Sequence, residues 1–131
     1  MQKFKKSKMF REYTDPQSGV VSYVLDLPSI PHTQSFYFTN PSATDDGRYV
    51  WVYVAFPPAG NATFGRSLAV IDTELDTFNH YPETMFHDAS PIVDTKTGVI
   101  YFANGSGIWK RSPNPKDKVQ LVAPLPDFMK G

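Results

Sequence analysis

Four side chains with chemically useful groups stand beside the ends of predicted strands, and they are His32, Tyr37, Arg66 and His87. An imidazole exchanges a proton near neutral pH, and a phenol or a guanidinium donates hydrogen bonds to a bound molecule. His87 precedes a predicted inner strand, a position suited to proton transfer. These four are the candidate substrate-binding residues. The sequence alone identifies no catalytic residue.

Each candidate also has a structural alternative. His32 could be a turn residue, and His87 could be a histidine that is hydrogen-bonded for structural reasons. Arg66 could cap a turn or pair with Asp72 or Glu74. The abundant aromatic residues are expected to serve mainly in packing between sheets.

Metal and catalytic motifs are missing from the sequence. His32, His80 and His87 lack the spacing of metal ligands, and the chain contains no cysteine. His80 lies inside a strand predicted to be outermost, so it is expected to be structural or exposed. No phosphate loop, nucleophile elbow or paired-carboxylate motif stands out. No metal site is therefore predicted within this chain.

The charge balance narrows the classes of partner. Lys and Arg number 13 and Asp and Glu number 13, so no overall field favours nucleic acid or an anionic membrane. The basic residues 3–8 are predicted to form a solvated tail. No apolar run approaches the roughly 20 residues of a membrane span, and the N-terminus lacks the apolar core of a signal peptide. A cytoplasmic location is the default expectation.

The candidate binding residues must be held in place by strands, and the predicted strand pattern occurs twice along the chain. Residues 40–53 align without a gap on residues 90–103, which places Pro41 on Pro91. In both copies a polar turn precedes an apolar strand. Two more apolar strands are predicted to follow, at 67–72 and 77–81 in the first copy and at 107–111 and 119–123 in the second. Four short antiparallel strands in a period of about 40 to 50 residues indicate a β-propeller blade.

The predicted fold is therefore all-β, a propeller fragment of about two four-stranded antiparallel blades plus an N-terminal closing strand. We expect a basic tail at 1–12, a closing strand and linker at 13–33, blade one at 34–82, blade two at 83–125 and a truncated connection at 126–131. The strand at 20–25 is expected to stand alone before the first repeat as the closing strand, or else to be an ordinary edge strand of blade one. Residues 34–39 are expected to begin blade one. Because a closed propeller needs at least about four blades, the chain is expected to be partial or to complete itself by association.

Strand direction then places the candidates in space. In an up-and-down meander, the connection into the first strand and the connection between the second and third strands leave the sheet at the same end. His32, Tyr37, Arg66, His87 and Asn61 are therefore predicted to gather around one end of one channel. Loops on a rigid scaffold are common places for binding sites.

Residues 13–20, 32–41 and 44–48 carry a resemblance to a known family. Here the chain resembles the N-terminal part of oligogalacturonate lyases, which are seven-bladed propellers of pectin breakdown, and more loosely the propeller-type ulvan lyases. The resemblance covers about residues 11–123. It implies β-elimination at a uronic acid, in which a base removes the proton beside the carboxylate, a cation or metal neutralises that carboxylate, and the glycosidic oxygen departs.

Only part of the family's site is implied for this chain. In oligogalacturonate lyases the metal-binding histidines and glutamine and the main catalytic arginine and histidine come from later blades, so none is transferred here. A divalent metal such as manganese is implied for the full-length family, and no cofactor for this chain. His32 matches a family motif and is implied to form a wall of the substrate channel. The chain alone is expected to be inactive.

Two functional hypotheses follow. The first is the N-terminal portion of a polysaccharide lyase whose partner is a uronic-acid oligosaccharide. The alternative is a non-catalytic propeller module that binds a protein or a glycan. In either case, apolar blade faces without neighbours predict self-association through the flanks at 20–25 and 108–121.

Overall fold

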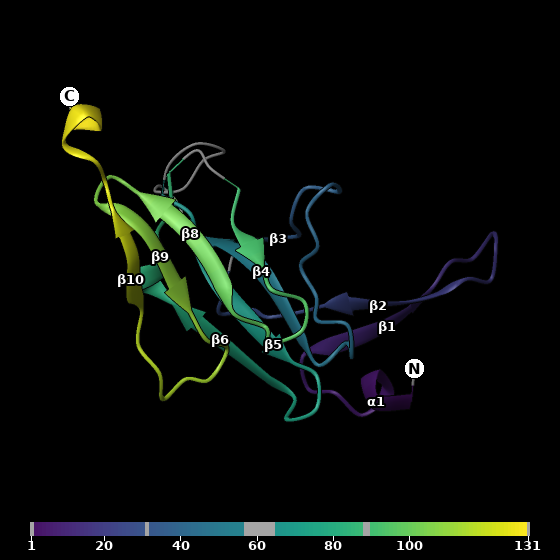
Figure 1. The fold of residues 1–131 in the computed structure, drawn as a ribbon. Helices are drawn as coiled ribbons and strands as arrows, with labels where there is room; N and C mark the ends of the chain where they lie inside the picture. The colour runs from purple at the N-terminus through teal and green to yellow at the C-terminus, as the bar shows by residue number, and fades with distance from the viewer. Residues whose placement is uncertain (1, 31, 57–64, 88–89, 131) are drawn as a thin grey trace.

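The computed structural model describes residues 2–30, 32–56, 65–87 and 90–130. Within these ranges the fold is all-β, with helical structure limited to α1 (Gln2–Lys5) and the 3-10 turns η1 (Pro82–Thr84) and η2 (Asp127–Met129). Two four-stranded antiparallel sheets pack against each other, and a two-stranded hairpin lies beside them (Figure 1). The sheets are open at their edges.

The first sheet is a meander whose strands follow chain order. Its members are β3 (His32–Gln34), β4 (Tyr49–Ala55), β5 (Ser67–Asp72) and β6 (Thr77–Tyr81). Runs of β-branched and aromatic residues favour β4 and β5, and both strands are covered on their two faces. The predicted strands at 67–72 and 77–81 have these bounds in the structure.

The second sheet has the same order. It contains β7 (Ile92–Val93), β8 (Ile100–Asn104), β9 (Gly107–Arg111) and β10 (Gln120–Pro124), each antiparallel to the next. The repeat predicted from the sequence is visible in the pairing, because Val93 pairs with Ile100 as Ala43 bridges to Val50. Two four-stranded antiparallel units fifty residues apart are therefore confirmed.

The first strand of the first sheet differs from the prediction at 34–39. The structure places this strand at His32–Gln34, and the chain returns to the sheet at Ala43. Between these points the chain turns away, with the Asn40 amide donating to the Tyr37 carbonyl at 2.8 Å. This turn, followed by Pro41, prevents one continuous strand.

The strand at 20–25 does not stand alone, and this prediction is wrong. β2 (Val21–Leu25) pairs along its length with β1 (Phe10–Thr14) in an antiparallel hairpin. The predicted basic tail at 1–12 therefore includes most of a strand. The residues before it are tied to the first sheet, because the Lys8 amide donates to Asp76 at 2.8 Å and Lys3 Nζ donates to Thr73 at 3.0 Å.

Cross-strand partners lie on the same face of a sheet, and successive residues of a strand alternate between its two faces. The fifty-residue repeat therefore matches each face of the first sheet with the equivalent face of the second. We call the face that carries Trp51 and Tyr53 the A face of the first sheet; fifty residues on, Tyr101 and Ala103 mark the A face of the second. The opposite face, with Val52 in the first sheet and Phe102 in the second, is the B face.

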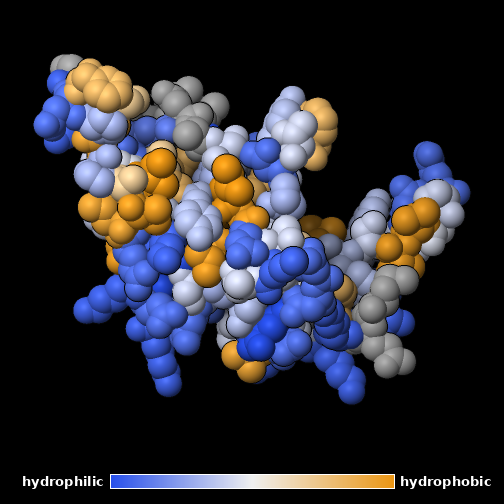
Figure 2. Space-filling model, viewed as in Figure 1, coloured by the Kyte–Doolittle hydropathy of each residue, from blue (hydrophilic) through white to orange (hydrophobic). Residues whose placement is uncertain are grey.

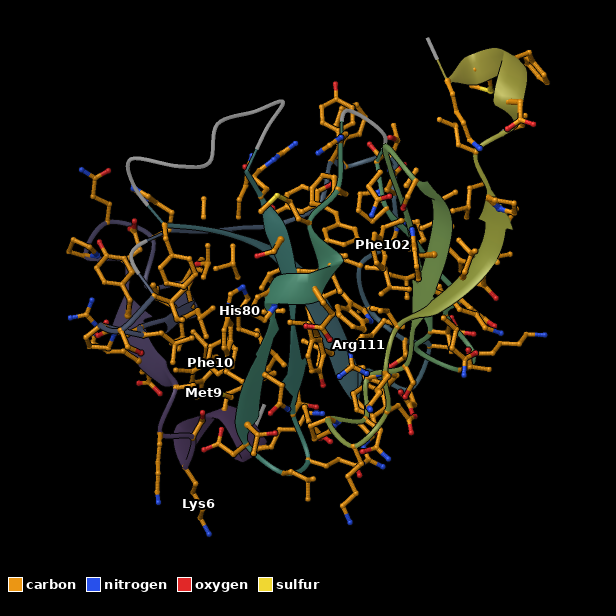
Figure 3. All side chains as sticks on the ribbon, turned by 90° about the vertical axis from the view of Figure 1, so that its left-hand side faces the viewer. Lys6, Met9, Phe10, His80, Phe102 and Arg111 are labelled. Carbon is orange, nitrogen blue, oxygen red and sulfur yellow. The ribbon has the colours of Figure 1, made fainter. Side chains whose placement is uncertain are left out.

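The two cores follow from these faces. The larger core joins the A face of the first sheet to the B face of the second, and contains Trp51, Tyr53, Leu68, Val70, Tyr81, Phe86, Val93, Ile100 and Phe102. The smaller core joins the B face of the first sheet to the hairpin, through Val52, Val54, Ala69, Ile71, Met9, Phe10 and Leu25. Figure 3 shows this order, with Met9 and Phe10 on one side of the sheet that carries His80 and with Phe102 and Arg111 on the other.

Candidate functional site

Arg66 lies immediately before β5, at the end of the first sheet where β3 begins and β4 ends. Its guanidinium carbon is 4.6 Å from the ring centroid of Tyr53 and 5.2 Å from that of Phe86. Aromatic ring faces attract a cation, so the two rings hold the plane of the guanidinium. The side chain is partly buried, which strengthens its interaction with an approaching anion.

A short turn between the sheets brings Phe86 to this position. The Thr84 hydroxyl donates to the Tyr81 carbonyl at 2.6 Å and accepts from the Leu68 amide at 2.8 Å. Phe86 follows, and its amide donates to the Arg66 carbonyl at 3.4 Å. The buried Thr84 therefore joins η1 to β5 and fixes where Phe86 meets Arg66.

Phe36 and Phe86 enclose Tyr53 from the two repeats. The ring of Phe36 stacks on Tyr53 with centroids 4.6 Å apart, and the ring of Phe86 lies 5.2 Å from Tyr53. Both phenylalanines are buried and stand fifty residues apart. The equivalent positions of the repeat thus meet at one tyrosine. The spacing of these two phenylalanines is the sequence signal that could have identified this feature.

A hollow of about 410 Å³ opens beside this aromatic group. Its lining combines the Arg66 cation, aromatic rings and small polar groups, namely Gln34, Ser35, Phe36, Tyr37, Phe38, Tyr53, Arg66 and Ser90. Tyr37 and Phe38 are exposed, with ring centroids 4.5 Å apart. We call this space the Arg66 hollow.

Tyr53 is held as a neutral phenol at the base of the hollow. Burial raises the pKa of Tyr53 above its ordinary value, while the charge of Arg66 and a side-chain hydrogen bond with Ser90 act in the opposite direction. A neutral phenol has a proton to donate and no negative charge to repel an anion. The hollow therefore presents a cation and hydrogen-bonding groups.

The structure brings two of the other three predicted residues, His32 and Tyr37, close to Arg66. Tyr37 and Arg66 line the Arg66 hollow, and His32 and Arg66 line a smaller neighbouring space of about 40 Å³. His87 is not among the residues lining either space; it is exposed and follows Phe86, with its amide donating to the Ala103 carbonyl at 3.1 Å. The predicted member Asn61 lies outside the described residues.

The carboxylates suggested as alternative partners of Arg66 pair with another arginine. Arg48 lies 3.0 Å from Asp72 and 3.4 Å from Glu74. Burial raises the pKa of Asp72, but hydrogen bonds from Arg48, Leu75 and Glu74 outweigh it and hold the pKa of Asp72 below its usual value. This ion pair closes the turn after β5, at the end of the sheet away from Arg66.

His80 has a polar partner that the sequence did not reveal. Its Nε2 lies 2.7 Å from the Ser67 hydroxyl, across the adjacent strands β5 and β6. Burial lowers the pKa of His80, and the charge of Glu83 opposes that shift in part. A neutral imidazole on the B face, bonded to a buried serine, agrees with the expected structural role.

Among the described residues, no three His, Cys, Asp or Glu side chains come together in a way that could hold a metal ion. The part of the chain that the structure describes also has no helix long and apolar enough to cross a membrane. No protein family, curated protein or solved structure matches this chain. For the manganese implied by the lyase resemblance, the described residues offer no fitting ligand set, so no chemical step is assigned to it.

Proposed function

We propose that the two sheets are consecutive blades of a β-propeller and that the Arg66 hollow binds the carboxylate of a uronic-acid oligosaccharide. The observation that carries the proposal is the guanidinium of Arg66, held over Tyr53 and Phe86 at the edge of a hollow with a polar and aromatic lining.

The blade interpretation is supported by the direction of packing. Two meanders of the same strand order, fifty residues apart, meet with the A face of one on the B face of the next. Such a contact can be repeated around an axis, as the radial repetition of a propeller requires. A two-fold sandwich would instead bring equivalent faces together.

Carboxylate recognition is supported by the chemistry of the hollow. The planar guanidinium presents paired N–H donors that match the two oxygens of a carboxylate. Since aromatic stacking already restricts Arg66, less conformational entropy is lost when an anion binds. The exposed rings of Tyr37 and Phe38 provide an apolar surface for a sugar ring, and Gln34 and Ser90 provide polar groups for its hydroxyls.

The reaction class in this proposal is β-elimination. Neutralising the carboxylate acidifies the adjacent C–H; its proton passes to a base, the electron pair forms a double bond, and the glycosidic oxygen leaves. In this step Arg66 neutralises the negative charge of the carboxylate. No proton acceptor is assigned among the described residues.

Titration calorimetry with trigalacturonate tests the binding step. Arg66→Gln should weaken binding about tenfold or more, because hydrogen bonds to charged groups contribute roughly 1.5–3 kcal/mol. Arg66→Lys keeps the positive charge but loses the planar geometry, so its affinity should lie between those of the wild type and Arg66→Gln. Lys116→Gln, an exposed change in the β9–β10 connection, is the matched control and should bind as the wild type does.

The methyl ester of trigalacturonate tests whether the site recognises the carboxylate. Loss of binding with the ester supports carboxylate recognition. Equal binding of acid and ester would refute it and favour a module for neutral glycans. Failure of the wild-type chain to bind either ligand would refute a uronide site.

A further inference from the structure

The A face of the second sheet is open and partly apolar. It carries Ile92, Tyr101, Ala103, Ile108 and Ala123, together with the polar Lys110 and Gln120, as the cross-strand pairs show. Ile92 is 64% exposed and Ile108 is 46% exposed. Figure 2 looks onto this side of the molecule and shows hydrophobic side chains gathered over the sheet that Figure 1 draws in front.

The equivalent face of the first sheet is covered. Trp51 and Tyr53, the counterparts of Tyr101 and Ala103, are buried against the B face of the second sheet. Two hydrogen bonds join the sheets there, from Trp51 Nε1 to the Gly98 carbonyl and from the Tyr81 hydroxyl to the Pro113 carbonyl, both at 2.8 Å. In the first repeat, the A face is therefore the surface on which the next β-layer packs.

The opposite end of the stack is formed by the hairpin. Phe10 and Leu25 on one face of the hairpin cover the B face of the first sheet. The alternate positions, Arg11 and Tyr13 with their partners Val24 and Ser22, form the other face. Tyr13 is 53% exposed and Val24 is 43% exposed. We call this second surface the outer hairpin face.

The layers of the chain are therefore stacked in one direction, as hairpin, first sheet and second sheet. Each of the two internal contacts joins a β-layer to the B face of the layer that follows it. One exposed surface with both apolar and polar side chains is left at each end of the stack. The outer hairpin face lies at the N-terminal end, and the open A face lies at the C-terminal end.

We propose that a second copy of this chain binds the open A face through its outer hairpin face, in a head-to-tail contact. The contact continues the stacking order already present within the chain. It is heterologous, because the two surfaces differ, and it leaves a free surface of each kind on the pair. This inference is independent of the uronide proposal, since the Arg66 hollow contributes to neither surface.

Sedimentation of single variants tests the contact. The wild-type chain should show a mass that rises with concentration in the micromolar range. Ile92→Lys or Ile108→Lys on the A face, and Val24→Lys or Tyr13→Ser on the hairpin, should each raise the concentration needed for association tenfold or more. Leu75→Lys, an exposed change in the β5–β6 turn, should associate as the wild type does. Thermal unfolding confirms that each variant is folded.

Mixing the variants distinguishes this contact from others. An A-face variant has an intact hairpin, and a hairpin variant has an intact A face, so an equimolar mixture should form pairs and nothing larger. A wild-type chain that stays monomeric would overturn the proposal. Hairpin variants that associate normally would point to contact between two A faces, and a mixture that stays monomeric would also refute the head-to-tail arrangement.

Discussion

The guanidinium carbon of Arg111 lies 3.7 Å from the centroid of the Tyr81 ring, so a cation of the second sheet is stacked on an aromatic ring of the first. Arg111 is buried, and its Nε lies 2.9 Å from a carboxylate oxygen of Glu83. The same guanidinium donates to the carbonyls of Ser112 and Asn114. Arg111 thus joins the two sheets and the loop after β9.

Replacing Arg111 should destabilise the fold. Arg111→Met keeps much of the volume but removes the stacked charge and the carbonyl hydrogen bonds, so the free energy of unfolding should fall by about 2–4 kcal/mol. Urea unfolding measures this. Arg11→Met is the control, because Arg11 is exposed and its pair with Asp26 spans 3.7 Å; it should cost under about 1 kcal/mol. If the free energy of unfolding falls equally in the two variants, Arg111 does not stabilise the contact between the sheets.

Two turn glycines form a matched pair for a second prediction. Gly47 and Gly98 have φ of 69° and 77°, where an L side chain costs about 1–2 kcal/mol. A Cβ at Gly47 meets nothing within 4 Å, but at Gly98 it lies 3.1 Å from Tyr49 and 3.3 Å from Pro113. Gly98→Ala should therefore be less stable than Gly47→Ala by about 1 kcal/mol or more in denaturant unfolding. The reverse order would show that the sheets are not packed this closely.

His80 predicts a pH dependence of stability. Burial lowers the pKa of His80 below its ordinary 6.5, so the unfolded chain binds the proton first. Stability from this residue is complete above pH 6.5 and declines as the pH falls toward the lower pKa of the folded state. His80→Gln should reduce this decline in urea unfolding between pH 8 and the acid range. An unchanged decline in His80→Gln would contradict the burial of a neutral imidazole.

Turnover provides a fourth prediction. With oligogalacturonate, the 131-residue chain should give no ultraviolet absorbance of an unsaturated uronide product, with or without manganese. The reason is that, if the proposed relationship to oligogalacturonate lyases holds, the metal ligands and main catalytic residues belong to later blades. Turnover that persists through purification and is lost in His87→Ala would overturn this expectation and make His87 a catalytic candidate.

Much of the strand pattern could be read from the sequence because it depends on neighbouring residues. Apolar and β-branched runs between polar turns predicted β5 and β6 with their observed bounds, and the alignment of Pro41 on Pro91 predicted two equivalent meanders. The same reasoning failed at 34–39, where the aromatic run looks like a strand but the chain turns out of the sheet. The turn is stabilised by contacts such as Phe36 on Tyr53, which join distant residues.

Tertiary structure alone decided which surfaces meet. The hairpin packs through Phe10 and Leu25 on the B face of the first sheet. In Phe10–Thr14 the charged Arg11 and Glu12 interrupt the apolar pattern, so periodicity alone did not identify this strand. The site shows the same division. The sequence predicted that His32, Tyr37 and Arg66 share one end of the sheets, but the position of Arg66 over Tyr53 and Phe86 depends on long-range packing, which local periodicity does not encode.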